Sequence, residues 1–384
     1  MPHTIPNHPA AGKRDFRVFA VNPGSTSTKI ALFEGETALL NECVGHDAAT
    51  LAAFPDIPSQ LPYRRETIRR VLRERGIELT GIDACVGRGG GLRSVEGGTY
   101  LADELMLRHA MTAANGIRHP ALLGVPLAAG FAAELGCPVY AVDPPDVDEF
   151  DTVARVTGVR GLYRQSHLHA LNLKETALRH AQLRGERYEE KNYIVCHLGG
   201  GISVSAHRRG RMVDGNDIAR GEGPMTPTRC GSIAAADVAA LCRRDGPEAV
   251  EELCTKNGGL VSLLGTSDAR EAVRRMDGGD AAAKLIWEAM LYQTAKWIGA
   301  MAAALRGDVD AILLSGGLVN EAALVEALRA ACGFLAPVYA YPGEREMEAM
   351  ARGVLRVLRG EEAAKRYTGT PAWTPEQANL PPAR

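Results

Sequence analysis

Two loops rich in glycine and hydroxyl groups carry the residue types and spacing best suited to chemistry in this sequence. In the first, an apolar run turns at Asn-Pro-Gly, and the polar side chains are those of Asn22, Ser25, Ser27 and Lys29. Backbone N–H groups, hydroxyls and one cation are groups that hold a phosphate. The second loop lies between two further apolar runs and contains Gly199, Gly200 and Gly201. Two such loops in the two halves of one chain predict a duplicated phosphate clamp with a nucleotide between the halves.

Alternating strands and helices must position these loops. In the first half we expect a hairpin of strands 16–22 and 28–34, strands 82–87 and 138–142, and helices 61–75 and 121–135, the last with a possible late start at 124–126. In the second half we expect a helix over 166–184 with Ser166 as N-cap, strands 193–198, 202–207, 211–213 and 309–314, and helices 234–243, 281–305, 321–331 and 344–359. We expect residues 1–14 to be frayed and the Pro-rich tail from Tyr367 to be peripheral.

The same order of strands and helices appears twice. It predicts an α/β protein of two similar lobes, with mixed sheets flanked by helices and a central cleft. We place the lobes at 1–155 and 156–344. With 384 residues the chain is too long for one ordinary core, which also favours two domains.

Bulk composition limits the possible partners. The formal net charge is −2 and the basic residues are dispersed, so neither nucleic acid nor an anionic membrane is an expected partner. The eight cysteines form no Cys-x-x-Cys, which predicts reduced, buried thiols and a cytoplasmic protein. Segment 1–14 lacks the apolar core of a signal peptide. The apolar stretch 281–305 contains charged residues, so we expect a buried amphipathic helix there, with enough apolar surface to suggest a homodimer or higher homo-oligomer.

Six motifs together resemble the acetate/butyrate kinase family of the actin-like ATPase superfamily, and within it the butyrate kinases. They occur in the expected order at 21–29, 87–91, 197–204, 223–231, 314–318 and 341–344. The resemblance implies duplicated actin-like (ribonuclease H-like) lobes, with the C-terminal segment of about 345–384 returning to the first lobe. It also implies reversible phosphoryl transfer between ATP and a short-chain acid, with Mg²⁺. We expect butanoate as the acid, and acetate, propionate or a branched-chain acid as alternatives.

Such a reaction needs no general base, because a carboxylic acid is already ionised at neutral pH. The enzyme must instead hold two anions in line and offset their charge. By the resemblance, Arg88 with Gly89 and Gly90 would bind the carboxylate, and Arg229 would stabilise the transferring phosphoryl group. Arg88 could instead be a surface arginine at a glycine turn, and Arg229 could be loop scaffolding.

The resemblance also suggests a metal site. Asn22 would orient the metal, and the family's metal-linked glutamate corresponds to Glu344 or Glu346. Asp143, after strand 138–142, is a candidate for orienting Mg²⁺. Asp143 could equally cap a turn, and the two glutamates could simply suit the dipole of the last helix.

The remaining candidates concern the nucleotide. His197 precedes the second glycine loop and would line the cleft, unless it is structural. An apolar strand is followed by Ser315, Gly316 and Gly317. Their small size would leave room for adenosine. Alternatively, they only begin a helix. Lys29 could be an ordinary exposed lysine, because strand register decides where it points.

One segment departs from the family pattern. Acetate kinases carry His-Gly-Thr-Ser-His before the second lobe, whereas this chain has Arg-Gln-Ser-His-Leu-His at 164–169. Arg164 or His167 could replace the missing histidine. The departure favours butyrate or a related short acid over acetate.

Two other functions fit a two-lobed chain of this superfamily. A sugar kinase would need an aspartate base, for which Asp143 could be recruited. An actin-like or chaperone-type ATPase would be expected to carry long insertions. We see no basic helix-turn-helix before the first hairpin, which argues against a sugar-responsive repressor.

Overall fold

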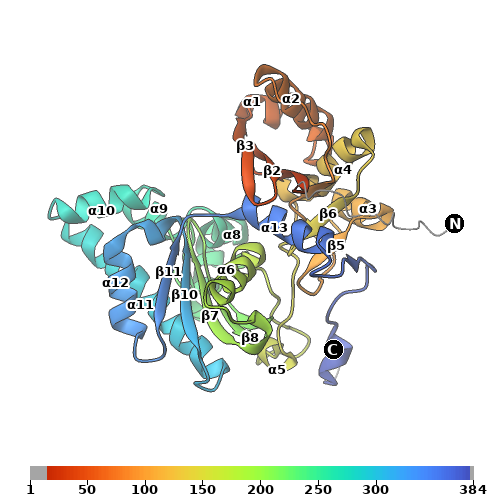
Figure 1. The fold of residues 1–384 in the computed structure, drawn as a ribbon. Coiled ribbons are helices and arrows are strands. Elements are labelled where there is room, and N and C mark those ends of the chain that lie inside the picture. The colour runs from red at the N-terminus through yellow and green to blue at the C-terminus, as the bar shows by residue number, and fades with distance from the viewer. Residues whose placement is uncertain (1–14, 381–384) are drawn as a thin grey trace.

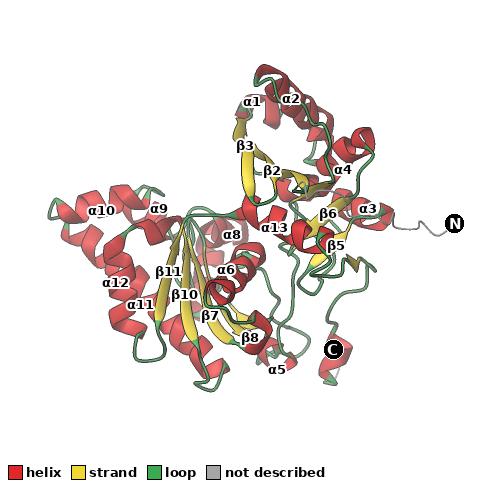
Figure 2. Cartoon of the chain, viewed as in Figure 1, coloured by secondary structure: helices red, strands yellow, loops and turns green. Residues whose placement is uncertain are grey.

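The computed structural model describes residues 15–380. Two β-sheets, each flanked by helices, account for most of the chain (Figures 1 and 2). The first sheet has the order β12-β5-β6-β4-β1-β2-β3 and the second has the order β11-β10-β7-β8-β9. The strands of the first sheet are β1 Arg17–Pro23, β2 Ser27–Glu34, β3 Thr37–Gly45, β4 Ala84–Gly87, β5 Thr99–Leu101, β6 Val139–Val142 and β12 Lys365–Arg366. Those of the second are β7 Asn192–Leu198, β8 Ile202–Arg208, β9 Arg211–Gly215, β10 Ala311–Gly316 and β11 Val338–Pro342.

The two sheets share one topology. In the first, β1, β2 and β3 are antiparallel neighbours, and β4 and β6 follow on the other side of β1 as parallel strands. In the second, β7, β8 and β9 are antiparallel, and β10 and β11 lie parallel on the other side of β7. The repeat confirms the duplicated mixed sheets predicted from the sequence. The first sheet is extended by β5, antiparallel to β6, and by β12.

Helices cover the sheets. Those before the second sheet are α1 Ala48–Ala52, α2 Leu61–Glu74, α3 Glu104–Thr112, α4 Gly124–Leu135, α5 Thr152–Arg155 and α6 Ala170–Leu183. Those after β9 are α7 Ala235–Asp245, α8 Pro247–Thr255, α9 Gly259–Leu264, α10 Ala269–Asp277, α11 Ala281–Ala304, α12 Ala322–Cys332 and α13 Glu346–Leu358. Short 3₁₀ turns occur at Pro58–Gln60, Pro120–Leu123, Tyr188–Glu190, Gly317–Asn320 and Pro375–Ala378.

The last long helix, α13, packs on the first sheet although it comes from the far end of the chain (Figure 1). Met350 and Val354 lie in one apolar cluster with Val18, Ala20 and Val86. The start of α13 therefore meets the carboxyl end of β1, where the first glycine loop begins.

Helix α11 buries one face and exposes the other. Trp287, Met290 and Ile298 are buried against the second sheet, whereas Lys284 and Glu288 are exposed. This confirms the predicted amphipathic helix. No helix within residues 15–380 is long and apolar enough to cross a membrane.

Several predicted elements need correction. Helix α6 begins at Ala170 with His169 at its N-cap, not with Ser166. The chain before it is held by tertiary contacts, because His169 bonds the Ser203 hydroxyl and Leu168 packs against Gly215. The sequence analysis also missed β3, β5, β11, β12, α1, α3, α5 and the helices between 247 and 277.

The C-terminal tail is not peripheral. The hydroxyl of Tyr367 is 3.0 Å from the backbone nitrogen of Arg93, and its ring is buried. Trp373 packs against Tyr163 and the guanidinium of Arg155.

The predicted fraying concerns residues 1–14, which lie outside the described residues. All eight cysteines are free. Cys85, Cys196 and Cys332 are buried, as predicted, but Cys43 is exposed.

Candidate active site

A cavity of about 390 Å³ lies where loops from the two sheets meet. Seven of the residues predicted from the sequence line it, namely Asn22, Ser27, Lys29, Arg88, Gly90, Arg229 and Glu346. Arg229 comes from the loop after β9. Asn22, Ser27 and Lys29 come from the adjoining ends of β1 and β2, Arg88 and Gly90 from the loop after β4, and Glu346 from the start of α13. The structure therefore brings residues from both halves of the chain to one cavity, but Ser25, His197 and the second glycine loop at 199–201 do not line it.

Glu346 is the central carboxylate of this cavity. Its Oε2 accepts a hydrogen bond of 2.7 Å from Asn22, and its Oε1 lies 3.9 Å from the guanidinium of Arg88. Burial raises the pKa of Glu346, but the charge of Arg88 and the Asn22 hydrogen bond outweigh it and hold the pKa below its usual value. Glu346 is therefore an anion at neutral pH.

Glu344 has a different position. Its carboxylate is 3.7 Å from the Lys29 ammonium and 3.9 Å from the His197 ring, and its side chain is 42% exposed. It does not line the cavity. Between the two glutamates that the sequence could not separate, the geometry favours Glu346 as the residue beside Asn22.

Arg64 organises the first glycine loop and was missed by the sequence analysis. It is fully buried on α2, and its guanidinium donates to the carbonyls of Gly24, Ser25 and Ser27. No ion pair to a carboxylate is found for it within residues 15–380. Arg64 is one of several arginines in the predicted amphipathic helix 61–75, so the sequence did not distinguish it from exposed ones. Ser25 is exposed and Ser27 partly so, which leaves their hydroxyls at the loop surface.

The second glycine loop is held from the other side of the cavity. The carbonyl of Gly200 accepts hydrogen bonds from the hydroxyls of Thr226 (2.7 Å) and Thr228 (2.9 Å). A Cβ atom on Gly201 would lie 2.2 Å from Nη1 of Arg229, so only glycine lets the arginine approach the loop. Burial lowers the pKa of Arg229, and its Nε has no hydrogen-bond partner among the described residues. Nη1 donates a long hydrogen bond of 3.4 Å to the Thr228 hydroxyl.

Two histidines lie beside this loop. The rings of His169 and His197 are 4.1 Å apart, and burial lowers the pKa of both. Both rings are thus neutral at pH 7. A Cβ atom on Gly199 would lie 3.0 Å from Nε2 of His197, so the glycine is packed against the histidine. His169 lines the cavity with His119, and neither was singled out from the sequence.

Asp143 does not present its carboxylate to the cavity. Its Oδ1 accepts a 2.7 Å hydrogen bond from the backbone of Gly98, and only its carbonyl oxygen meets Arg88, at 3.3 Å. Burial raises the pKa of this carboxyl. Gly89 likewise does not line the cavity, because it packs against Pro144, where a Cβ atom would lie 2.5 Å away.

The predicted adenosine loop has one buried and one open part. The Ser315 hydroxyl donates to the Cys196 carbonyl at 3.1 Å and is buried, so it is engaged within the sheet. Gly316 has φ +98°, and its backbone exchanges two hydrogen bonds with Gly343. Gly317 has open space at the position of a Cβ atom. None of the three lines the 390 Å³ cavity.

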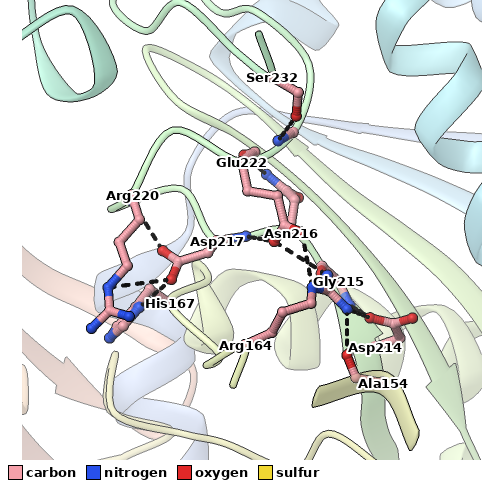
Figure 3. A network of polar contacts seen from close by, with 11 residues as sticks. Ala154, Arg164, His167, Asp214, Gly215, Asn216, Asp217, Arg220, Glu222 and Ser232 are labelled. Atoms are coloured by element: carbon pink, nitrogen blue, oxygen red, sulfur yellow. Dashed lines mark hydrogen bonds and ion pairs between the residues drawn. The ribbon is translucent and has the colours of Figure 1, made fainter. Parts of the chain in front are cut away.

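The family's missing histidine could be replaced by Arg164 or His167. These two side chains lie in different surroundings (Figure 3). Arg164 is paired with Asp214 at 2.9 Å and Glu222 at 2.8 Å, away from the cavity. His167 lines the cavity, and its Nδ1 is 2.8 Å from Asp217. Arg164 is therefore structural, and His167 is the one that can meet a ligand.

The residues present fit a magnesium ion that takes most of its ligands from phosphate and water. Within residues 15–380 no three His, Cys, Asp or Glu side chains form a metal cluster. Mg²⁺ at nucleotide sites is commonly held by one or two protein oxygens together with phosphate oxygens. Glu346 supplies an ionised carboxylate, and Asn22 donates through Nδ2, which leaves its Oδ1 for a metal or a metal-bound water.

Comparison with known proteins agrees with this geometry. A model of the acetokinase family matches residues 160–336. Probable butyrate kinase 2 of Caldanaerobacter subterraneus subsp. tengcongensis is 45% identical over 355 residues, which cover 92% of this chain and 99% of that protein.

Solved structures show the same fold. Acetate kinase from Porphyromonas gingivalis superposes with a TM-score of 0.72 at 18% identity, covering 88% of this chain and 99% of that chain. A propionate kinase from Francisella tularensis gives a TM-score of 0.67 at 18% identity, with coverages of 88% and 98%. The duplicated actin-like fold predicted from the sequence is confirmed.

Proposed function

The chain belongs to the acetokinase family, and from this premise we propose that it transfers a phosphoryl group reversibly between ATP and a short-chain fatty acid, with butanoate as the acid. The observation that carries the proposal is the meeting of Arg88, Glu346 and Arg229 in one cavity lined by the first glycine loop. Two arginines suit two anionic substrates, and the ionised glutamate suits a metal-bound phosphate.

In the proposed reaction an oxygen of the carboxylate forms a bond to the γ-phosphorus of ATP. The bond from that phosphorus to the β–γ bridging oxygen breaks, and ADP leaves with its electron pair. No proton has to be removed, because the acid is already an anion. The neutral state of His169 and His197 is consistent with a site that binds and orients its substrates without removing a proton from them.

Each residue has a proposed part. Arg88 binds the carboxylate, and Arg229 stabilises charge on the moving phosphoryl group. The backbones of the first and second glycine loops hold the phosphates, with Lys29 beside them. Asn22 and Glu346 hold Mg²⁺, which when bound neutralises the phosphate charge. Gly316 and Gly317 remain proposed for adenosine.

The acyl chain has an apolar surface available in the same cavity. Ile117, Leu122 and Leu168 line it together with Arg88. These residues lie on loops and a 3₁₀ turn, so single-sequence periodicity did not reveal them. An alkyl chain of a few carbons would be removed from water there, at about 0.8 kcal/mol per buried methylene.

A sugar kinase is less well supported. It would need an aspartate base beside the substrate hydroxyl, and Asp143, the aspartate predicted for that role, bonds Gly98 instead of lining the cavity. Asp146 does line the cavity, and the glucose arm of the assay below tests whether it serves as such a base.

We also propose lobes at 15–155 and 156–344, with α13 belonging to the first, and a cytoplasmic location for a protein with eight free cysteines. Leu285 and Tyr292 of α11 are each 67% exposed, and we propose that this face supports self-association.

A panel of acids tests the function. Purified protein with ATP and Mg²⁺ is assayed for ADP release with acetate, propionate, butanoate and isobutyrate, and with glucose as a sugar. We expect acid-dependent release that is highest with butanoate. We expect Arg88→Ala to lower kcat/KM for the acid by about 10² or more, whereas Arg70→Ala, an exposed arginine on α2, serves as the matched control. Release with the sugar but with no acid would refute the proposal.

A further inference from the structure

Part of the wall of the 390 Å³ cavity is polar. Asn115, Asp146 and His167 line it, and the same three residues also line a second cavity of about 410 Å³ beneath the C-terminal tail. They form a shared wall between the two spaces. An alkyl chain could form no hydrogen bond with these polar side chains.

Asp146 has an unused hydrogen-bonding atom in the wall. Its side chain is only 7% exposed, and its Oδ1 accepts from Asn115 at 2.6 Å and from the Leu92 backbone at 3.2 Å. Its Oδ2 has no partner among the described residues. Burial raises the pKa of this carboxyl to about 7, so it is an acceptor or a donor according to its proton.

His167 is held in place by groups behind it (Figure 3). Its Nδ1 is bonded to Asp217, and Oδ1 of Asp217 in turn accepts from the backbones of Ala219 and Arg220. The ring is thereby oriented, and Nε2 is the nitrogen that can serve a ligand. That nitrogen accepts in the neutral ring and donates in the protonated ring.

The second cavity contains two more unpartnered polar groups. The hydroxyl of Ser166 and the indole N–H of Trp373 are buried without a hydrogen-bond partner in the described part of the chain. Buried polar atoms in proteins are nearly always paired, so the unpaired Oδ2 of Asp146 points to a polar partner at the shared wall, whereas Ser166 and Trp373 line only the second cavity.

We propose that the wall of Asp146 and His167 is a subsite for a hydroxyl group on the acyl chain, so that a short-chain hydroxy acid is a better substrate than butanoate. This inference rests on the proposed acid kinase function. A hydroxyl both donates and accepts, so it can pair with Oδ2 of Asp146 and with Nε2 of His167. An ammonium group only donates, and a methyl group leaves both side chains unpaired.

The test compares substrates that differ by this one group. ADP release by the full-length protein is measured with butanoate, 3-hydroxybutanoate, 4-hydroxybutanoate and 4-aminobutanoate, and kcat/KM is determined for each. We expect one hydroxy acid to exceed butanoate by about tenfold or more, because a buried site built for a hydroxyl discriminates against the analogue lacking it.

Substitutions connect the preference to the wall. We expect Asp146→Val and His167→Leu to bring the ratio of hydroxy acid to butanoate kcat/KM toward one. Asp146→Asn keeps hydrogen bonding at similar volume and is expected to retain more of the ratio. Thermal unfolding of each variant shows whether it is folded, and His167→Leu carries the test if Asp146→Val is not.

The outcomes separate the two proposals. Butanoate phosphorylated at least as well as both hydroxy acids, or a ratio unchanged by the substitutions, would overturn the hydroxyl subsite and leave the acid kinase intact. A preference for 4-aminobutanoate would overturn the hydroxyl assignment. ADP release with none of the acids would refute the kinase and the subsite together.

Discussion

The side-chain amide of Asn22 donates a 2.7 Å hydrogen bond to Glu346, a residue 324 positions away in the sequence. Asn22 lies in β1 at the start of the first glycine loop, and Glu346 is the first residue of α13. The contact exists because α13 packs on the first sheet. The candidate metal site is therefore complete only when the two ends of the chain have come together.

The first prediction compares the two glutamates near this site. We expect Glu346→Gln to lower kcat by about 10², because it removes an ionised oxygen from the metal position and leaves Arg88 without its nearest carboxylate. We expect Glu344→Gln to change kcat by less than about threefold, since surface ion pairs contribute little. Steady-state kinetics over a range of Mg²⁺ concentrations measures both. A larger loss for Glu344→Gln than for Glu346→Gln would reverse the assignment.

A second prediction concerns the buried arginine behind the first loop. Arg64→Met removes donors from the Gly24 and Ser27 carbonyls and from the Thr28 hydroxyl. We expect unfolding free energy to fall by about 3 kcal/mol and KM for ATP to rise, because the loop loses its support. Denaturant unfolding and ATP titration are the measurements.

The control for this change lies on the same helix. Arg70 is exposed and forms an ion pair with Glu74 at 3.8 Å. We expect Arg70→Met to change stability by no more than about 0.5 kcal/mol. Equal effects of the two substitutions would mean that Arg64 does not organise the loop.

A third prediction uses two adjacent glycines. Gly316 has φ +98°, and a Cβ atom there would lie 2.3 Å from the Leu198 carbonyl oxygen. We expect Gly316→Ala to cost about 3 kcal/mol of stability. Gly317 has open space at its Cβ position, so we expect Gly317→Ala to stay within about 0.5 kcal/mol. Chemical denaturation of both variants decides the matter, and a tolerated alanine at 316 would show that the strand end can shift.

A fourth prediction concerns acid stability. Burial and the nearby charge of Arg64 lower the pKa of His46 from 6.5 to about 4. The unfolded chain therefore binds a proton that the folded chain does not between these two values. The contribution of His46 to stability is fully present above pH 6.5 and is lost as pH falls through about 4.

The measurement is denaturant unfolding of the wild type and of His46→Gln from pH 4 to pH 7.5. We expect the wild type to lose up to about 3 kcal/mol more than the variant over this interval. Parallel curves for the two proteins would show that His46 does not titrate differently on folding.

The sequence itself determined the repeated strands and the two glycine loops. Strand residues at 18–21 and 193–196 are apolar in unbroken runs, and such runs are typical of buried strands. These features follow from backbone sterics and burial, which a single sequence records.

Only the tertiary structure decided which polar side chains face the cavity. Packing of α13 turned Glu346 inward and left Glu344 exposed, and the hydrogen bond to Gly98 turned the Asp143 carboxylate away. Arg64 met the first loop because α2 lies beside it. Each of these choices depends on where a distant segment packs, and no local pattern of residue types encodes that distance.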